Sequence, residues 1–186
     1  MLSVLIDKLQ KYSAEYDKEI KDVSFLLAFS GGMDSLVMAS LLLKIRKRYS
    51  IRLAFAHINH NAHNQSERIE KFCSKYCYDN SVIFHLDRLF INSQSNFEAC
   101  AREKRYAILE KIAEKHSYHY ILTAHHQNDQ LETVYMKKID GGDWISQIGI
   151  RERFGKLRRP LLNIPKSEIK VYTKLNRIKY IEDPTN

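Results

Sequence analysis

A short segment of small and polar residues, SGGMDS at positions 30–35, has the composition of a phosphate-binding turn. Its adjacent glycines can adopt backbone angles closed to other residues and let the main chain approach a ligand. If a helix begins here, its free N–H groups and its dipole attract an anion. Asp34 is acidic at the place where phosphate would lie, so a cation is needed between the two negative groups. Mg²⁺ that bridges Asp34 and phosphate would meet this need. Two glycines and a serine alone also fit an ordinary capped turn.

A second polar segment, TAHHQNDQLET at positions 123–133, combines imidazole and carboxylate side chains. On a helix, His125 and Asp129 are four residues apart and Asp129 and Glu132 are three apart, so the three share one face. Such a face suits metal binding, proton transfer or the capture of a cationic amine. The structural alternative is that Asp129 only stabilises the first turn of the helix.

Two further segments carry groups that could contact an anionic ligand. In AREKRY, positions 101–106, Arg102 and Arg105 are three residues apart and could clamp phosphate, although a solvated basic face is the commoner role of such a run. The segment HINHNAHNQS starts at His57 and contains three histidines without a nearby cysteine or acid. We interpret it as a polar loop at the nucleotide rather than a zinc site.

The elements that must position these residues alternate between strands and helices. Apolar runs predict strands at 23–29, 51–57, 82–86 and 118–123, and helical spacing predicts helices from Leu2, at 36–45, 65–78, 96–116, 129–139 and 167–175. This alternation predicts an α/β fold, a Rossmann-like parallel sheet flanked by helices. Each chemical segment is taken to lie just after a predicted strand, so we expect the site at the carboxyl edge of the sheet.

Composition narrows the class of protein further. The 186 residues fit one domain, and the net charge of +8 favours an anionic partner, although a merely basic protein is as common. The odd count of three cysteines argues against a disulfide framework. Without an apolar run long enough for a membrane span or a signal peptide, we expect a cytoplasmic protein with no membrane partner.

The loop SGGMDS resembles the SGGxDS loop of the PP-loop ATP pyrophosphatases, and it lacks the lysine ending of other nucleotide loops. With the HxNH, ARxxRY, TAHHxxDQxET, RPLL and EDPTN segments, positions 25–186 resemble the tRNA(Ile)-lysidine synthetase family. The resemblance implies that 1–186 form a PP-loop catalytic domain. It also implies an ATP site formed by Ser30, Gly31, Gly32, Met33, Asp34, Ser35 and His57.

The activity that the resemblance implies is a ligase reaction. ATP adenylates the wobble cytidine of the CAU anticodon of tRNA(Ile), and free L-lysine then displaces AMP to form lysidine. The catalytic residues would be Asp34, Arg102, Arg105, His125, Asp129 and Glu132, with Mg²⁺ held by Asp34 and Asp129. We also expect the basic cluster of Lys156, Arg158 and Arg159 to meet tRNA phosphate, or to be a solvated loop.

Two departures and three alternatives accompany this interpretation. The family usually has an Arg-Gly-rich turn where this chain has Asp140-Gly141-Gly142, and its members continue into tRNA-gripping domains beyond position 186. The alternatives are a tRNA thiolation enzyme, a small-molecule amidotransferase or synthetase, and a truncated nucleotide- or RNA-binding module. Cys73 and Cys77 lack the spacing of a CxxC pair, which disfavours thiolation. The sequence leaves the oligomeric state open, a homodimer included.

Overall fold

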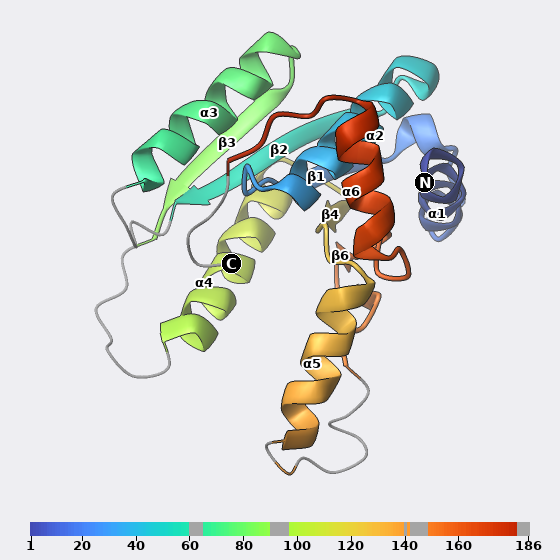
Figure 1. Ribbon diagram of the computed structural model, residues 1–186. Coiled ribbons are helices and arrows are strands. Elements are labelled where there is room, and N and C mark those ends of the chain that lie inside the picture. Colours follow the sequence, from blue (N-terminus) through green and yellow to red (C-terminus); the bar gives the residue numbers. More distant parts are fainter. Residues whose placement is uncertain (60–64, 90–96, 140, 142–148, 182–186) are drawn as a thin grey trace.

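Strands and helices alternate along the chain, as the computed structural model shows for residues 1–59, 65–89, 97–139, 141 and 149–181 (Figure 1). The helices are α1 (Leu2–Ala14), η1 (Ile20–Asp22), α2 (Met33–Tyr49), α3 (Ser66–Asp79), α4 (Phe97–Lys115), α5 (Gln127–Ile139) and α6 (Lys166–Leu175). The strands are β1 (Ser24–Ala28), β2 (Arg52–Asn59), β3 (Ile83–Arg88), β4 (Tyr120–Leu122), β5 (Arg153–Phe154) and β6 (Leu157–Arg158).

One sheet joins these strands in the order β3-β2-β1-β4-β6-β5. All neighbouring pairs are parallel except β5 and β6. From β1 the chain builds outward through β2 to β3, then returns through α4 to place β4 on the other side of β1. The strand order therefore reverses between β1 and β4, and the loops that follow these strands meet at one edge. The predicted α/β fold with a parallel sheet is confirmed.

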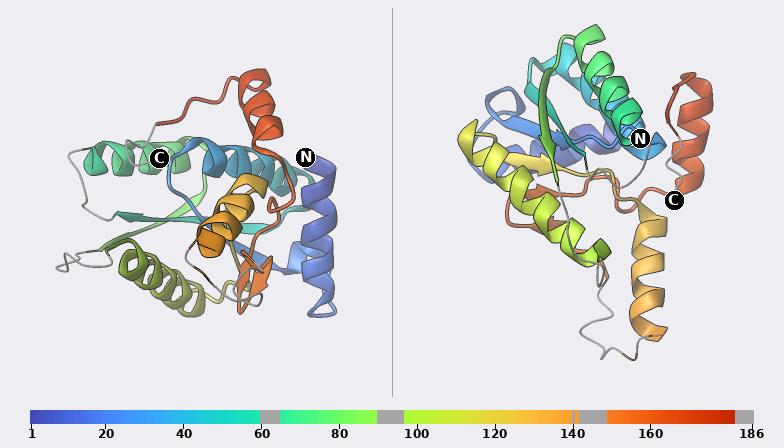
Figure 2. Two further views of the ribbon diagram at one scale, coloured as in Figure 1. Left: turned by 60° about the horizontal axis from the view of Figure 1, so that its bottom comes forward. Right: turned by 90° about the vertical axis from the view of Figure 1, so that its left-hand side faces the viewer.

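Helices cover both faces of this sheet, and alternate residues of each strand supply two separate cores (Figures 1 and 2). On β1, Phe25 and Leu27 face the core under α1, α2, α3 and α6. Leu26 faces the other core, where α4 contributes Leu109 and Ala113. Such runs, apolar at every position, are typical of a parallel strand buried on both sides.

The helix α5 differs from the others because none of its described residues is buried. It projects away from the sheet, so that only its first turn lies near the body of the protein (Figure 2). Exposed apolar side chains line it, among them Leu131, Tyr135 and Ile139. The start of α5 therefore lies at the edge of the sheet, whereas the rest of the helix is exposed to solvent.

The observed bounds differ from the prediction in a few places. Helix α2 begins at Met33, so the second half of the SGGMDS segment is the first turn of a helix. The two-residue strands β5 and β6 were not predicted. Within the described ranges, no helix is both long and apolar enough to cross a membrane.

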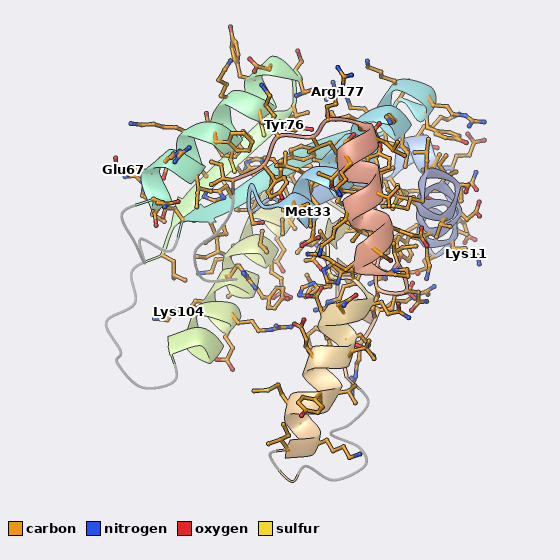
Figure 3. All side chains as sticks on the ribbon, in the orientation of Figure 1. Lys11, Met33, Glu67, Tyr76, Lys104 and Arg177 are labelled. Carbon is orange, nitrogen blue, oxygen red and sulfur yellow. The ribbon has the colours of Figure 1, made fainter. Side chains whose placement is uncertain are left out.

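Exposed basic side chains are distributed over several elements. Lys11 on α1, Lys104 on α4 and Arg177 beyond α6 all extend from the body in different directions (Figure 3). The net positive charge is therefore not confined to one face, and it does not by itself locate a nucleic-acid surface.

Candidate active site at the carboxyl edge of the sheet

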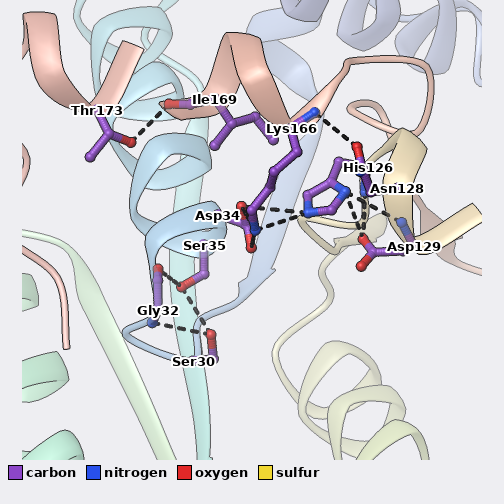
Figure 4. A network of polar contacts seen from close by, with 10 residues as sticks. All are labelled: Ser30, Gly32, Asp34, Ser35, His126, Asn128, Asp129, Lys166, Ile169 and Thr173. Atoms are coloured by element: carbon purple, nitrogen blue, oxygen red, sulfur yellow. Dashed lines mark hydrogen bonds and ion pairs between the residues drawn. The ribbon is translucent and has the colours of Figure 1, made fainter. Parts of the chain in front are cut away.

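The turn between β1 and α2 is closed by its own hydroxyl groups (Figure 4). The Gly32 N–H donates to Ser30 Oγ at 3.3 Å, and Ser30 Oγ donates to Ser35 Oγ at 3.1 Å. Ser35 Oγ in turn donates to the Gly32 carbonyl at 2.9 Å. This ring of hydrogen bonds holds the loop in shape without a ligand, so phosphate would meet a preformed cradle.

Gly31 is the residue of this turn that no other amino acid can replace without strain. Its φ of +81° lies in the left-handed region that L-residues with a side chain rarely adopt. A Cβ at Gly31 would lie 3.0 Å from Cys73 Sγ and 3.3 Å from Ile69 Cγ2, both on α3. The turn therefore packs tightly against α3, which fixes its position relative to the sheet.

Gly31→Ala is expected to lower the free energy of unfolding by about 1–3 kcal/mol, because it adds both backbone strain and a steric clash. The adjacent Gly32 offers a matched control, since its φ is −77° and a Cβ there would meet only Ser30 Oγ at 3.5 Å. Urea unfolding of the two variants measures the difference. Equal destabilisation by both alanines would contradict this account of the loop.

At the start of α2, the Asp34 carboxylate is held by cationic and imidazole groups from two distant segments (Figure 4). The Lys166 ammonium donates to Asp34 Oδ1 at 2.8 Å and to Oδ2 at 2.7 Å. His126 Nε2 lies 3.7 Å from Asp34 Oδ1 and 3.1 Å from Lys166 Nζ. Burial alone would raise the pKa of Asp34, but the hydrogen bonds from His126 and Lys166 outweigh it, so the pKa is lowered and the group is a carboxylate at neutral pH.

The start of α5 is organised by His126 and Asp129. His126 precedes the helix, and Asp129 Oδ2 accepts the His126 backbone N–H at 2.7 Å, which is half of a capping box. The same carboxylate oxygen lies 3.4 Å from His126 Nδ1. Asp129 thus stabilises the first helical turn, as the structural alternative predicted, and also orients the imidazole that reaches Asp34.

Three helix starts converge on this spot. Helices α2, α5 and α6 begin at Met33, Gln127 and Lys166, and residues of their first turns or caps contact one another through Asp34, His126 and Lys166. Each helix start carries partial positive charge from the helix dipole, so the three together favour a bound anion. The convergence lies where β1 and β4 end, at the predicted edge.

A basic cluster lies beside the start of α5, formed by Arg102, Arg105, Tyr106, His125 and Arg159. The guanidinium groups of Arg102 and Arg105 lie 5.5 Å and 5.6 Å from the centre of the Tyr106 ring, and Arg159 donates to the Tyr106 hydroxyl at 3.5 Å. Burial, together with the charges of Arg159, Arg102, Arg105 and His126, lowers the pKa of His125 to about 3. His125 is therefore neutral at physiological pH, and the cluster is suited to an anion.

His125→Gln is expected to make folding less sensitive to acid. Since the folded pKa is lowered from 6.5 to about 3, the unfolded chain takes up the proton first as pH falls. This contribution to stability is complete above about pH 6.5 and is lost progressively as pH falls toward 3. Between pH 7 and 5, wild type should lose roughly 2 kcal/mol more than the variant in urea unfolding. Parallel losses would contradict the lowered pKa.

The remaining predicted site residues differ in how far they are buried. His57 is buried and its Nδ1–H donates to the Phe29 carbonyl at 2.9 Å, so it supports the loop from behind, and a nucleotide contact remains a prediction. Met33 opens α2, and Glu132 is exposed one turn along α5. ATP binding by Met33, catalysis by Glu132, and metal binding by Asp34 and Asp129 also remain predictions. Cys100's side chain and residues 60, 63, 140, 142 and 182–186 lie outside the described part.

The sequence interpretation was wrong about two basic residues, Arg158 and Arg159, and it missed two others. Arg159 is buried and donates through Nη1 to the Arg151 carbonyl at 2.6 Å, so it is not part of a solvated loop. Arg158 is buried, with its guanidinium 2.6 Å from Glu15 Oε2 and 4.4 Å from the centre of the Tyr120 ring, so it does not meet tRNA as part of a solvated cluster. The missed residues are His126 and Lys166. The position of His126, three residues before Asp129, is a capping signal, but no local pattern marks Lys166.

Comparisons with known proteins agree with this geometry. The chain is 34% identical over 193 residues to the tRNA(Ile)-lysidine synthase of Treponema denticola, covering 99% of this chain and 42% of that protein. It is 33% identical over 168 residues to the enzyme of the same name from Enterococcus faecalis, covering 88% of this chain and 36% of that one. The chain thus spans roughly two fifths of the length of these relatives.

The fold is similar to that of a solved U34-tRNA thiolase from Methanococcus maripaludis, with a TM-score of 0.76 and 20% identity, over 97% of this chain and 66% of that one. A family description, the PP-loop domain, matches residues 2–186. The match includes the closed turn at 30–35 and the α5 start that lies against it. The chain therefore belongs to the PP-loop domain family.

Proposed function

We propose that the chain is the catalytic domain of a tRNA(Ile)-lysidine synthase, a ligase that joins lysine to the wobble cytidine of a CAU anticodon at the expense of ATP. Membership in the PP-loop family implies ATP binding. The observation that carries the proposal is the convergence of Asp34, His126 and Asp129 at one sheet edge. A phosphate cradle and a carboxylate for an incoming amine thus lie side by side, in a chain whose relatives bear this enzyme's name.

In the first step, the 2-oxo oxygen of cytidine attacks the α-phosphorus of ATP, the bond to the bridging oxygen breaks, and pyrophosphate leaves. The backbone N–H groups of the 30–35 loop hold the polyphosphate, and the start of α2 adds its dipole. Arg102, Arg105 and Arg159 supply positive charge near His125, where anionic tRNA or nucleotide groups would be drawn in. The adenylated oxygen is then a good leaving group.

In the second step, the ε-amine of lysine attacks C2 of the activated base, the C2–O bond breaks, and AMP leaves. Free lysine carries a proton at neutral pH, which it must lose before attack. Asp129 is the carboxylate best suited to hold the ammonium and, with His126, to accept the proton, because its side chain is one-third exposed at the start of α5 and lies against the buried His126 imidazole. His125 is too weak a base for this task at neutral pH, so we assign it a neutral role near the arginines.

Magnesium fits this site through Asp34. The Lys166 ammonium already lies against both carboxylate oxygens, so the position favours a cation. No group of three or more metal-binding side chains occurs within the described residues, which suits an ion that takes one carboxylate plus phosphate oxygens. Bound there with Asp34, Mg²⁺ would neutralise charge on the polyphosphate.

The described cysteines do not support the thiolation alternative. Cys73 and Cys77 are both buried on α3. Burial raises the pKa of Cys77 to about 12, and burial together with Cys77 raises the pKa of Cys73, so neither forms the thiolate that sulfur transfer requires. The likeness to the thiolase, at 20% identity, concerns the fold.

The proposal is tested by incubating the protein with ATP, L-lysine and an unmodified tRNA(Ile) transcript bearing CAU. Lysidine and AMP should form in equal amounts, and neither should form without lysine or with a transcript in which uridine replaces the wobble cytidine. Pyrophosphate exchange into ATP should require tRNA but not lysine. Absence of lysidine together with AMP formation from another acceptor would reassign the enzyme within its family. Absence of both exchange and AMP would reject the proposal.

A further inference from the structure

Lys166 makes contacts at the phosphate loop that the proposed reaction does not explain. Its ammonium lies within 2.8 Å of both Asp34 carboxylate oxygens and 3.1 Å from His126 Nε2 (Figure 4). His126 lies between the two carboxylates, with Nε2 3.7 Å from Asp34 Oδ1 and Nδ1 3.4 Å from both Asp129 Oδ2 and the Asp129 backbone nitrogen. A lysine cation is thus surrounded by two carboxylate oxygens and an imidazole nitrogen.

This arrangement resembles the environment of a metal ion. Carboxylate oxygens and imidazole nitrogens are ordinary ligands of divalent cations, and a ligating histidine commonly donates its other N–H to a carboxylate. Here Asp129 takes the place of that carboxylate, 3.4 Å from His126 Nδ1. The Lys166 ammonium therefore occupies a position where Asp34 and His126 could otherwise hold a divalent cation.

The backbone of Lys166 is fixed, so only its side chain can leave this position. Lys166 is the first residue of α6, and its N–H donates to Asn128 Oδ1 at 3.2 Å. One turn later, Ile169 is fully buried in the main core. Both side chains of the Lys166–Asp34 pair are 28% exposed, and a partly solvated pair of this kind adds little to folding stability. A contribution to stability alone is therefore a weak explanation of the pair.

The Lys166–Asp34 ion pair has an electrostatic effect on the binding of ATP. Without Lys166, the phosphate loop would present the bare Asp34 carboxylate, with Asp129 close behind His126, to the polyphosphate of ATP. Like charges at such short range oppose binding. An ammonium that neutralises Asp34 removes this repulsion, and the same ammonium is an effective donor to phosphate.

We propose that Lys166 is a built-in counter-ion of Asp34, which excludes divalent cations from this site before ATP binds and moves onto the polyphosphate when ATP binds. Asp34 is then released for the metal, so nucleotide and metal bind together rather than in sequence. This inference rests on the proposed nucleotide site, but it concerns binding equilibria that can be measured without turnover.

The test replaces the charge while keeping the length of the side chain, in Lys166→Met. The control is Lys170→Met, the same change one turn further on α6 at an exposed position. Mn²⁺ binding is measured by electron paramagnetic resonance without nucleotide. Wild type and Lys170→Met should bind little Mn²⁺ at this site, whereas Lys166→Met should bind it about tenfold more tightly. Adding Asp34→Asn to Lys166→Met should abolish the gain.

A second measurement follows the affinity for a non-hydrolysable ATP analogue in Mg²⁺ and in EDTA. Lys166→Met should bind the analogue about tenfold more weakly in EDTA, with a smaller loss in Mg²⁺, and Lys170→Met should match wild type in both. The inference is overturned if Lys166→Met matches Lys170→Met in both measurements while melting at the same temperature. If wild type binds no nucleotide at all, the proposed function fails, and the Mn²⁺ comparison still decides the role of Lys166.

Discussion

Asp34→Asn is expected to reduce tRNA-dependent pyrophosphate exchange on the order of a thousandfold, the effect of losing one well-placed electrostatic group. The amide keeps the size of the side chain and can still accept a hydrogen bond from Lys166, so the turn should stay folded. It cannot carry the negative charge that, in the proposed site, would help to hold Mg²⁺. The loss should therefore appear in the rate of adenylation, measured as exchange of labelled pyrophosphate into ATP.

A change in ATP affinity distinguishes the loss of the Asp34 charge from structural damage to the 30–35 loop. In EDTA, Asp34→Asn should bind ATP at least as tightly as wild type, because a negative charge beside the polyphosphate has been removed. A damaged loop would bind ATP more weakly with and without metal. Asp79→Asn is the matched control, since Asp79 ends α3 in an exposed pair with Lys75. Normal exchange by Asp34→Asn would exclude the carboxylate from the chemistry.

The parts of the fold that the sequence predicted are those with strong local signals. Continuous apolar runs marked β1 and β2 because both faces of a parallel sheet are covered, as the two cores on either side of Leu26 and Leu27 illustrate. The two-residue strands β5 and β6 are too short to produce a period, and the sheet position of β6 depends on its pairing with β4. Such elements are defined by tertiary partners rather than by their own residues.

Within the candidate site, too, the sequence indicated the residues that have strong local signals. Asp34 and Asp129 were both named, because each lies in a polar segment after an apolar strand. The sequence did not show that His126 lies between these two carboxylates. It also did not show that Lys166, 132 residues from Asp34, reaches Asp34 through the packing of α6. Among adjacent histidines, the sequence also favoured His125 over His126, although the helix start directs His126 toward Asp34.

The arginines show why charge alone misleads about function. Arg158 and Arg159 are neighbours in sequence, but alternate residues of a strand point to opposite faces. Arg158 therefore lies against Glu15 and Tyr120 on one face, while Arg159 reaches Tyr106. Of this pair, only Arg159 joins Arg102 and Arg105 beside His125. Because Arg159 is itself buried, an anionic partner would meet the more exposed Arg102 and Arg105 of this cluster rather than the 156–159 segment.

Asp129→Asn is expected to reduce lysidine formation by about a hundredfold or more, the usual contribution of an acid–base group, while pyrophosphate exchange stays within about threefold of wild type. Asp129 caps α5 through the His126 N–H, and in the proposed reaction it would also hold the amine of lysine. The asparagine oxygen can still accept that N–H, so the cap survives and only the charge is lost. A quench assay that follows both AMP and lysidine separates the two steps.

Two further variants test whether the loss of lysidine formation comes from the missing charge of Asp129 rather than from a missing cap on α5. Asp129→Ala removes the cap as well, so it should also lower the free energy of unfolding by about 1 kcal/mol, whereas Asp129→Asn should not. Glu132→Gln changes the same charge one turn further into solvent and should have the smaller effect on lysidine formation. If Asp129→Asn formed lysidine at a near-normal rate, Asp129 would be a helix cap alone, and the base for lysine would have to be sought at Glu132 or His126.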